Sequence, residues 1–245
     1  QAKLKSVQGM VVKTFEFILG HTDFKTLGCG RTDAKVSADD FAFELFVNET
    51  FDCDKLLFRL NKELPSDIRA KSVQTVGDDF NIIQHSKVKE YHYYFSSDEK
   101  SHPFNATLIR DFGAALNMEL MKEAASLFMG THNFKRFASK PSANTVFERE
   151  ILLSVIEKNT RFVDAYTPME AYVFKVRSKG FLRYQVRLMV GALVDVGRGD
   201  MTLEDLKETL DNFEGTQIRH IAPSSGLILH KVEFDWSSTK AQTDK

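Results

Sequence analysis

The sequence predicts an α+β fold with a mostly antiparallel sheet. Segments with helical periodicity and segments with alternating apolar residues occur together in both parts of the chain. They do not follow the strict strand–helix alternation that is typical of parallel α/β proteins. Apolar residues make up 42% of the 245 residues, which is ample material for a core.

The first hundred residues contain two predicted helices. Ser6 is a typical N-cap residue, apolar residues recur at helical spacing after it, and Gly20 ends this first helix. A shorter helix over residues 56–64 ends before Pro65. The strands predicted in this part are residues 24–27, 41–47, 68–76 and 87–95.

A polar stretch around residues 96–102 lacks periodicity and predicts a boundary between two halves. The predicted halves are residues 1–100 and 101–236, followed by a polar tail, 237–245. The sequence Thr202-Leu203-Glu204-Asp205 is a capping box that opens a helix. The other elements predicted in the second half are helices over 118–129 and 182–196 and strands over 151–159, 172–177 and 227–236.

Composition excludes several classes of protein. The sequence has no apolar run of about eighteen residues and no secretory leader pattern, so we expect a cytoplasmic protein without a membrane span. Two cysteines, Cys29 and Cys53, cannot build a disulfide framework. The seven histidines are scattered without finger or helix spacing, so no metal site is predicted. A net charge of −1 neither supports nor excludes binding to nucleic acid, because a basic surface can be local.

The loop Gly28-Cys29-Gly30-Arg31-Thr32-Asp33-Ala34 lies between two predicted strands. Its glycines permit close approach of a ligand, and it presents one cation, Arg31, and one anion, Asp33. A glycine-containing surface turn is one interpretation of this pattern. A phosphate-binding loop is disfavoured, because the Gly-Lys-Ser/Thr sequence and the third glycine that such loops require are both missing.

This loop, with Val36 and Ala38 after it, resembles the signature of the tRNA pseudouridine synthase A family. The resemblance covers nearly the whole chain in collinear order. The other matching segments are Ser6-Val7-Gln8-Gly9, residues 60–68, Asp79-Phe80-Asn81 with residues 89–93, residues 130–134, residues 181–191, Ala222-Pro223 and Gly226-Leu227.

The resemblance implies the pseudouridine synthase fold, with two related halves around one continuous sheet, and a role for each site residue. Asp33 would be the nucleophile, without a metal or cofactor, when the bond between uracil N1 and ribose C1′ is broken and the base is rejoined at C5. Arg31 would hold the target nucleotide out of the stack, and Arg187 would pair with Asp33. Tyr91 would stack on the uracil and assist removal of the C5 proton, and Leu227 would form the floor beneath the base.

The family resemblance also implies a tRNA substrate, held by a homodimer across both subunits. Its targets would be uridines of the anticodon stem-loop, at positions 38–40 of the tRNA, reached by base flipping. Scattered cations would contact RNA phosphates. The candidates are Lys87, Lys89, Lys135, Arg136, Lys140, Arg149, Lys179, Arg183 and Arg198.

The sequence departs from the family pattern at several places. Lys35 and Ser37 replace the usual glycine and histidine after the aspartate, and Asp39 and Asp40 add charge nearby. Residues 82–84 lack a common arginine, and the sequence begins at the Ser-Val-Gln helix, which a strand precedes in the family. An alternative is therefore a non-catalytic RNA-binding or tRNA-remodelling member of the same fold. A metal-independent hydrolase that uses Asp33 ranks last, because no second carboxylate or histidine stands at a recognisable spacing.

Overall fold

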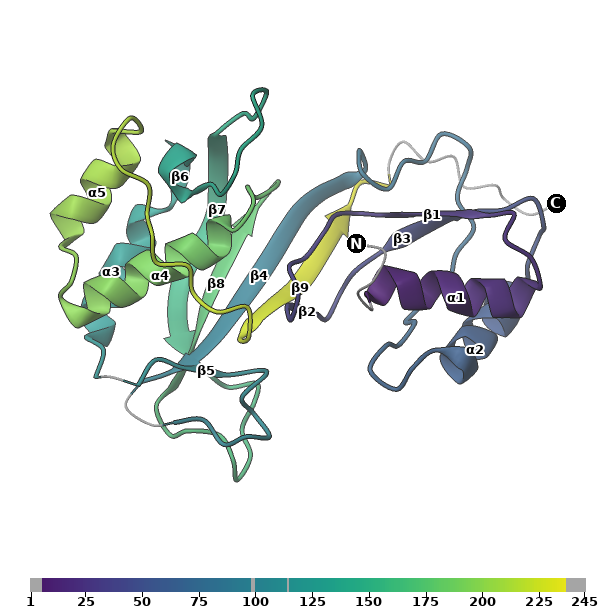
Figure 1. Ribbon diagram of the computed structural model, residues 1–245, viewed down its shortest axis with the longest axis horizontal. Helices are drawn as coiled ribbons and strands as arrows, with labels where there is room; N and C mark the ends of the chain where they lie inside the picture. Colours follow the sequence, from purple (N-terminus) through teal and green to yellow (C-terminus); the bar gives the residue numbers. More distant parts are fainter. Residues whose placement is uncertain (1–5, 98–99, 114, 237–245) are drawn as a thin grey trace. The chain divides into compact units, whose positions relative to one another are not determined.

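The computed structural model describes residues 6–97, 100–113 and 115–236 (Figure 1). The chain forms two compact units. The first unit contains Gln1–Arg31, Ala42–His85 and Asp235–Lys245, and the second contains Thr32–Phe41 and Ser86–Phe234. The units therefore interleave along the sequence. None of the helices in the described part of the chain is long and apolar enough to cross a membrane.

The first unit packs two helices together and carries a small sheet. Helix α1 (Val7–Leu19) begins where the Ser6 hydroxyl accepts a hydrogen bond from Gly9 N, and it ends at Gly20 in the left-handed conformation. Helix α2 (Cys53–Glu63) is capped by Asp52. Strands β1 (Lys25–Gly28) and β3 (Phe43–Phe46) form an antiparallel pair. The core of this unit consists of Val11, Phe15, Ile18, Leu56 and Leu60.

The second unit contains a seven-stranded sheet in the order β2-β9-β4-β8-β7-β6, with β5 beside β4. Most neighbours are antiparallel, and the β2–β9 and β4–β5 pairs are parallel. The strands are β2 (Ser37–Ala38), β4 (Ser86–Ser96), β5 (Arg110–Asp111), β6 (Gly130–Asn133), β7 (Glu148–Lys158), β8 (Ala171–Ser178) and β9 (Leu227–Phe234).

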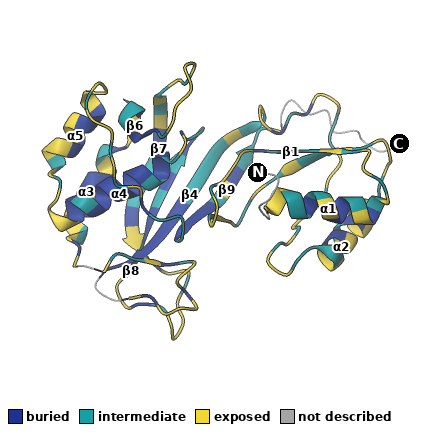
Figure 2. Ribbon diagram, in the orientation of Figure 1, coloured by how far each residue is buried: buried dark blue, intermediate teal, exposed yellow. Residues whose placement is uncertain are grey.

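Helices cover one face of this sheet. They are α3 (Met118–Leu127), α4 (Gln185–Arg198) and α5 (Leu203–Asp211), with a short 3₁₀ helix at Lys135–Phe137. Alternation along β4 sends Tyr93 and Phe95 into the core beneath α3 and α4, whereas Tyr94 packs with Val173 and Ile228 on the opposite face. Helix α4 is buried along most of its length (Figure 2), because it lies at the centre of this core.

The predicted α+β class and the mainly antiparallel sheet are confirmed, but the strand expected over 68–76 is wrong. This segment contains no strand. The Asn61 side chain bonds both the N–H and the carbonyl of Ala70, at 2.9 Å each, so these backbone groups are satisfied without a strand partner. Ala70 and Val73 pack against the core of the first unit.

Other differences concern boundaries and short strands. Helix α4 begins at Gln185 rather than at 182, because Tyr184 is left-handed, with φ of 64°. Strands β1 and β3 form a sheet of their own, apart from the seven-stranded one, rather than part of a single continuous sheet. The short β2, β5 and β6 were not expected. The boundary proposed near residue 100 lies within the second unit, just after β4, which pairs with β8 and β9 of that unit. The proposed tail 237–245 lies outside the described residues.

Candidate active site

Asp33 lies in the segment that leads into β2, at the start of the second unit. Its carbonyl accepts a hydrogen bond from Val36 N at 3.2 Å, which closes a tight turn. Lys35, within this turn, has a φ of 69°, the left-handed region that glycine adopts without strain. This explains in conformational terms why a glycine suits the position that Lys35 occupies. The Asp33 side chain is 31% exposed, so the carboxylate is reachable from solvent.

Arg187, near the start of α4, contacts this carboxylate. Its Nη1 donates to Asp33 Oδ2 at 3.0 Å, and its Nε donates to the Ala222 carbonyl at 2.7 Å. The Arg187 guanidinium also lies over the Tyr184 ring, 4.8 Å from its centroid. Its side chain is only 14% exposed. Arg187 is therefore held on three sides and presents a fixed cation to Asp33.

The segment before Ala222 is pressed against α4 and fixes the carbonyl that Arg187 bonds. A Cβ on Gly191 would lie 1.8 Å from the His220 carbonyl oxygen, so only glycine permits this approach. His220 Nδ1 lies 2.6 Å from Oδ1 of Asp195, which belongs to α4, as Gly191 does. Ala222 N in turn donates to the Arg187 carbonyl at 3.0 Å. No sequence motif joins His220 to Asp195, 25 positions apart, so this pair was not expected.

Tyr91 and Leu227 belong to the same side of the sheet as α4. Tyr91, on β4, is half-buried and packs against the core cluster that contains α4, and Leu227, on β9, is a buried member of that cluster. The Tyr91 and Phe181 rings are nearly perpendicular, at 87°, with centroids 5.3 Å apart. Tyr93 is fully buried and donates to the Pro223 carbonyl at 3.0 Å, and burial raises the pKa of its hydroxyl well above the ordinary value. Tyr91 is thus the more accessible of the two tyrosines.

The predicted RNA-contacting cations differ in their surroundings. Arg31 is exposed and belongs to the first unit. Lys135 pairs with Glu214 at 2.9 Å and Arg136 with Glu208 at 2.7 Å, so both are engaged within the protein. Arg149 and Lys179 line an open hollow of about 510 Å³ together with Phe181, the residue that touches Tyr91. Lys179 is also paired, with Glu150 at 3.2 Å, and Glu148 and Glu150 line the same hollow.

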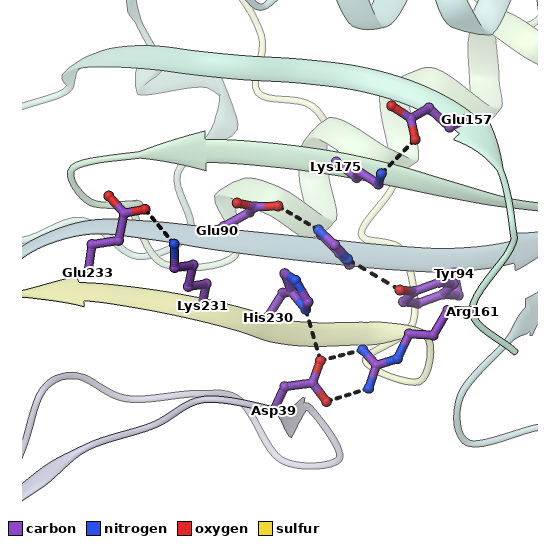
Figure 3. Close-up of polar contacts among 10 residues, drawn as sticks. Asp39, Glu90, Tyr94, Glu157, Arg161, Lys175, His230, Lys231 and Glu233 are labelled. Atoms are coloured by element: carbon purple, nitrogen blue, oxygen red, sulfur yellow. Dashed lines mark hydrogen bonds and ion pairs between the residues drawn. The ribbon is translucent and has the colours of Figure 1, made fainter.

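A second polar cluster lies on the opposite face of the sheet (Figure 3). The possible ligand atoms of Glu90, His92 and His230 lie within 4.8 Å of one another. However, the two imidazole rings stack, with centroids 3.9 Å apart and an interplanar angle of 17°. A metal ion binds in the plane of an imidazole, and one ion could not lie in the planes of two stacked rings. His92 Nε2 instead lies 2.7 Å from Glu90 Oε1, and its Nδ1 lies 3.2 Å from the Tyr94 hydroxyl.

Comparison with known proteins identifies related sequences. A family profile described as tRNA pseudouridine synthase matches residues 124–235, which include Arg187 and Leu227. The chain is 31% identical over 229 residues to a tRNA pseudouridine synthase A 2 of Bacillus cereus, covering 94% of this chain and 89% of that protein.

Relatives from two other organisms give similar values. The tRNA pseudouridine synthase A of Dictyoglomus thermophilum is 31% identical over 238 residues, covering 94% of this chain and 90% of that protein. That of Thermodesulfovibrio yellowstonii is 30% identical over 236 residues, covering 96% and 92%. With likeness along nearly the whole length, the chain belongs to the tRNA pseudouridine synthase A family of isomerases.

Proposed function

We propose that this protein converts uridine to pseudouridine in the anticodon stem-loop of tRNA, with Asp33 as the nucleophile. The observation that carries the proposal is the ion pair between Asp33 and Arg187, whose cation is itself fixed by Ala222 and Tyr184. A carboxylate held by a rigid guanidinium keeps one orientation, and correct orientation of a nucleophile lowers the activation barrier. Tyr91 and Leu227 lie on the helix-covered side of the sheet, in the same cluster as α4.

In the proposed reaction, the uridine is flipped out of the stack and the Asp33 carboxylate bonds to C1′ as the bond between N1 and C1′ breaks, which releases uracil as an anion. The uracil turns, and its C5 attacks C1′, which breaks the bond to Asp33 and releases the carboxylate. The C5 proton is then removed with the help of Tyr91, and N1 takes up a proton. Atoms and electrons balance, because the product is an isomer of the substrate.

The remaining site residues would bind the RNA. Leu227 would lie beneath the flipped base, and Arg31 would hold the nucleotide outside the stack. Arg149 and Lys179 line the hollow beside Phe181, where they would contact phosphates, so we expect binding to weaken as the salt concentration rises. The family resemblance also implies a homodimer and a cytoplasmic location. Sedimentation would test the first of these two predictions, and imaging of a tagged protein the second.

The reaction and the nucleophile are tested together by tritium release from tRNA labelled at uracil C5. We expect release by the wild-type protein, and none above background by Asp33→Asn, which keeps the size of the side chain and removes its charge. Asp211→Asn is the matched control, because Asp211 is an exposed residue at the end of α5. Mapping pseudouridine along the product tRNA identifies the target position, and a target outside the anticodon stem-loop would contradict that part of the proposal.

Release by both Asp33→Asn and the wild type would remove Asp33 from the role of nucleophile. If the wild type binds tRNA but releases no tritium, the non-catalytic RNA-binding alternative replaces the proposal. Binding is measured separately by filter retention, so that a loss of affinity is not mistaken for a loss of chemistry.

A further inference from the structure

The segment after Asp33 is joined to the sheet by very little backbone structure. Strand β2 has two residues, and Ser37 and Ala38 pair in parallel with Ile228 and Leu229 of β9. Asp39 N extends this ladder by donating to the Leu229 carbonyl at 2.9 Å. Both residues of β2 are exposed. Such a short ladder holds a loop weakly, so side-chain contacts at its end carry more weight.

Asp39 supplies these contacts on the face of the sheet opposite α4 (Figure 3). Its carboxylate accepts two hydrogen bonds from Arg161, one of them 2.7 Å from Nη2 to Oδ1 and the other from Nη1 to Oδ2. His230 Nδ1 donates to the same carboxylate at 3.0 Å. Burial opposes ionisation of Asp39, but the bonds from Arg161 and His230 hold its pKa below the ordinary value. The group is therefore a bidentate ion pair with a third donor.

The partners of Asp39 are themselves anchored to other parts of the second unit. The Arg161 guanidinium lies over the Phe162 ring, 4.8 Å from its centroid. His230 stacks on His92, which lies between Glu90 and the Tyr94 hydroxyl on β4. The carboxylate of Asp39 is thus tied to strands β4 and β9 and to the loop that contains Arg161.

We propose that Asp39, hydrogen-bonded by Arg161 and His230, is a positioning residue that holds the loop bearing Asp33 in its reactive conformation. Asp39 follows Asp33 by six positions. The loop is then held by Arg187 on the helix-covered face and by Asp39 on the opposite face, and the neighbouring Asp40 carboxylate accepts a hydrogen bond from Val232 N at 3.1 Å. Losing the second anchor would let the loop move while Asp33 and Arg187 remain present. The inference rests on the proposed function, since Asp39 would act by holding Asp33, the proposed nucleophile.

The first test is amide hydrogen exchange, which does not depend on activity. In Asp39→Asn, and in Arg161→Met, we expect faster exchange in the peptide that covers residues 33–40. The double variant should exchange no faster than Asp39→Asn alone, because Asp39→Asn already removes the ion pair with Arg161. The control is Glu157→Gln, which removes the ion pair with Lys175 on the same face of the sheet but leaves the loop alone. Unchanged exchange in Asp39→Asn would overturn the proposal.

The second test is the kinetics of tritium release from C5-labelled tRNA. A displaced nucleophile lowers kcat, and we expect a loss of about 10- to 100-fold in Asp39→Asn with KM nearly unchanged. Arg161→Lys, which keeps the positive charge, should lose less kcat than Arg161→Met. A faster-exchanging loop with kcat unchanged, or a loss confined to KM, would overturn the positioning role. An inactive wild type would instead refute the proposed function, while the exchange experiment would still decide whether Asp39 holds the loop.

Discussion

Replacing Gly191 by alanine tests how strongly the segment before Ala222 depends on its contact with α4. An added Cβ would lie 1.8 Å from the His220 carbonyl oxygen and 2.7 Å from its carbonyl carbon. Both opposing groups are backbone, so no side chain can rotate away. Either α4 or the 218–222 segment must shift, and that segment carries the Ala222 carbonyl that Arg187 bonds.

The expected loss of stability follows from three opposing contributions. Alanine in a helix interior is favoured over glycine by about 1 kcal/mol. Overpacking in a filled core costs about 1–3 kcal/mol or more. Displacing Ala222 weakens two hydrogen bonds, each contributing about 1 kcal/mol or somewhat more where the donor is charged. The free energy of unfolding should therefore fall by about 2–4 kcal/mol, a large part of the ~5–15 kcal/mol that holds a typical domain together.

Two other glycines in the second unit serve as graded controls in urea denaturation. A Cβ on Gly180 meets nothing within 4 Å, so Gly180→Ala should be close to neutral. A Cβ on Gly197 would lie 2.6 Å from Sδ and 2.8 Å from Cγ of Met121, a flexible side chain that adjusts more readily than backbone. We expect the order of destabilisation Gly191 > Gly197 > Gly180. Wild-type stability in Gly191→Ala, or a larger loss in Gly197→Ala, would refute this account of how α4 and the loop pack.

Two further predictions concern the loop and the histidine pair. Lys35→Gly should leave the free energy of unfolding unchanged or raise it by up to about 1 kcal/mol. The left-handed conformation of lysine costs about 1–2 kcal/mol, and its relief exceeds the entropy cost of glycine. Urea unfolding measures this, and a loss above about 1 kcal/mol would contradict it. Burial lowers the pKa of His92 despite Glu90, with His230 and Lys175 adding to the decrease, so the folded state binds a proton less readily than the unfolded state. The part of the folding stability that depends on a neutral His92 should be fully present above about pH 6.5 and should fall as the pH drops below this value. His92→Gln should flatten this dependence between about pH 7 and 5.

Local sequence patterns predicted the longer elements well, because their causes are local. The Ser6 cap and Gly20 bound α1, and the Thr202–Asp205 capping box opens α5, as expected. The false strand over 68–76 arose because alternation alone does not reveal that Asn61 satisfies the backbone of Ala70. The two-residue β2 has no pattern long enough to detect, since its pairing depends on β9, far along the chain.

The candidate site shows the same division between local and distant causes. Asp33 and Arg187 are 154 positions apart, and only the family resemblance linked them before the structure placed them 3.0 Å from each other. Asp39 lies 122 positions from Arg161 and 191 from His230. From the sequence, Asp39 is only an added charge near the loop, because no rule of spacing connects residues at such separations. The roles of Asp33, Arg31, Tyr91, Arg187 and Leu227 in chemistry stay predictions that the tritium experiments address.

The departures at Lys35 and Ser37 bear on the choice between a catalytic and a non-catalytic protein. A lysine in the left-handed region stores about 1–2 kcal/mol of strain, which persists only where surrounding contacts fix the backbone. Two such contacts flank Lys35: the ion pair of Asp33 with Arg187, and that of Asp39 with Arg161. A loop without a conformational requirement would be expected to relax rather than keep this strain. The strained turn between two charged anchors therefore favours a loop that must present Asp33 in one orientation, which is what nucleophilic catalysis requires and RNA binding alone does not.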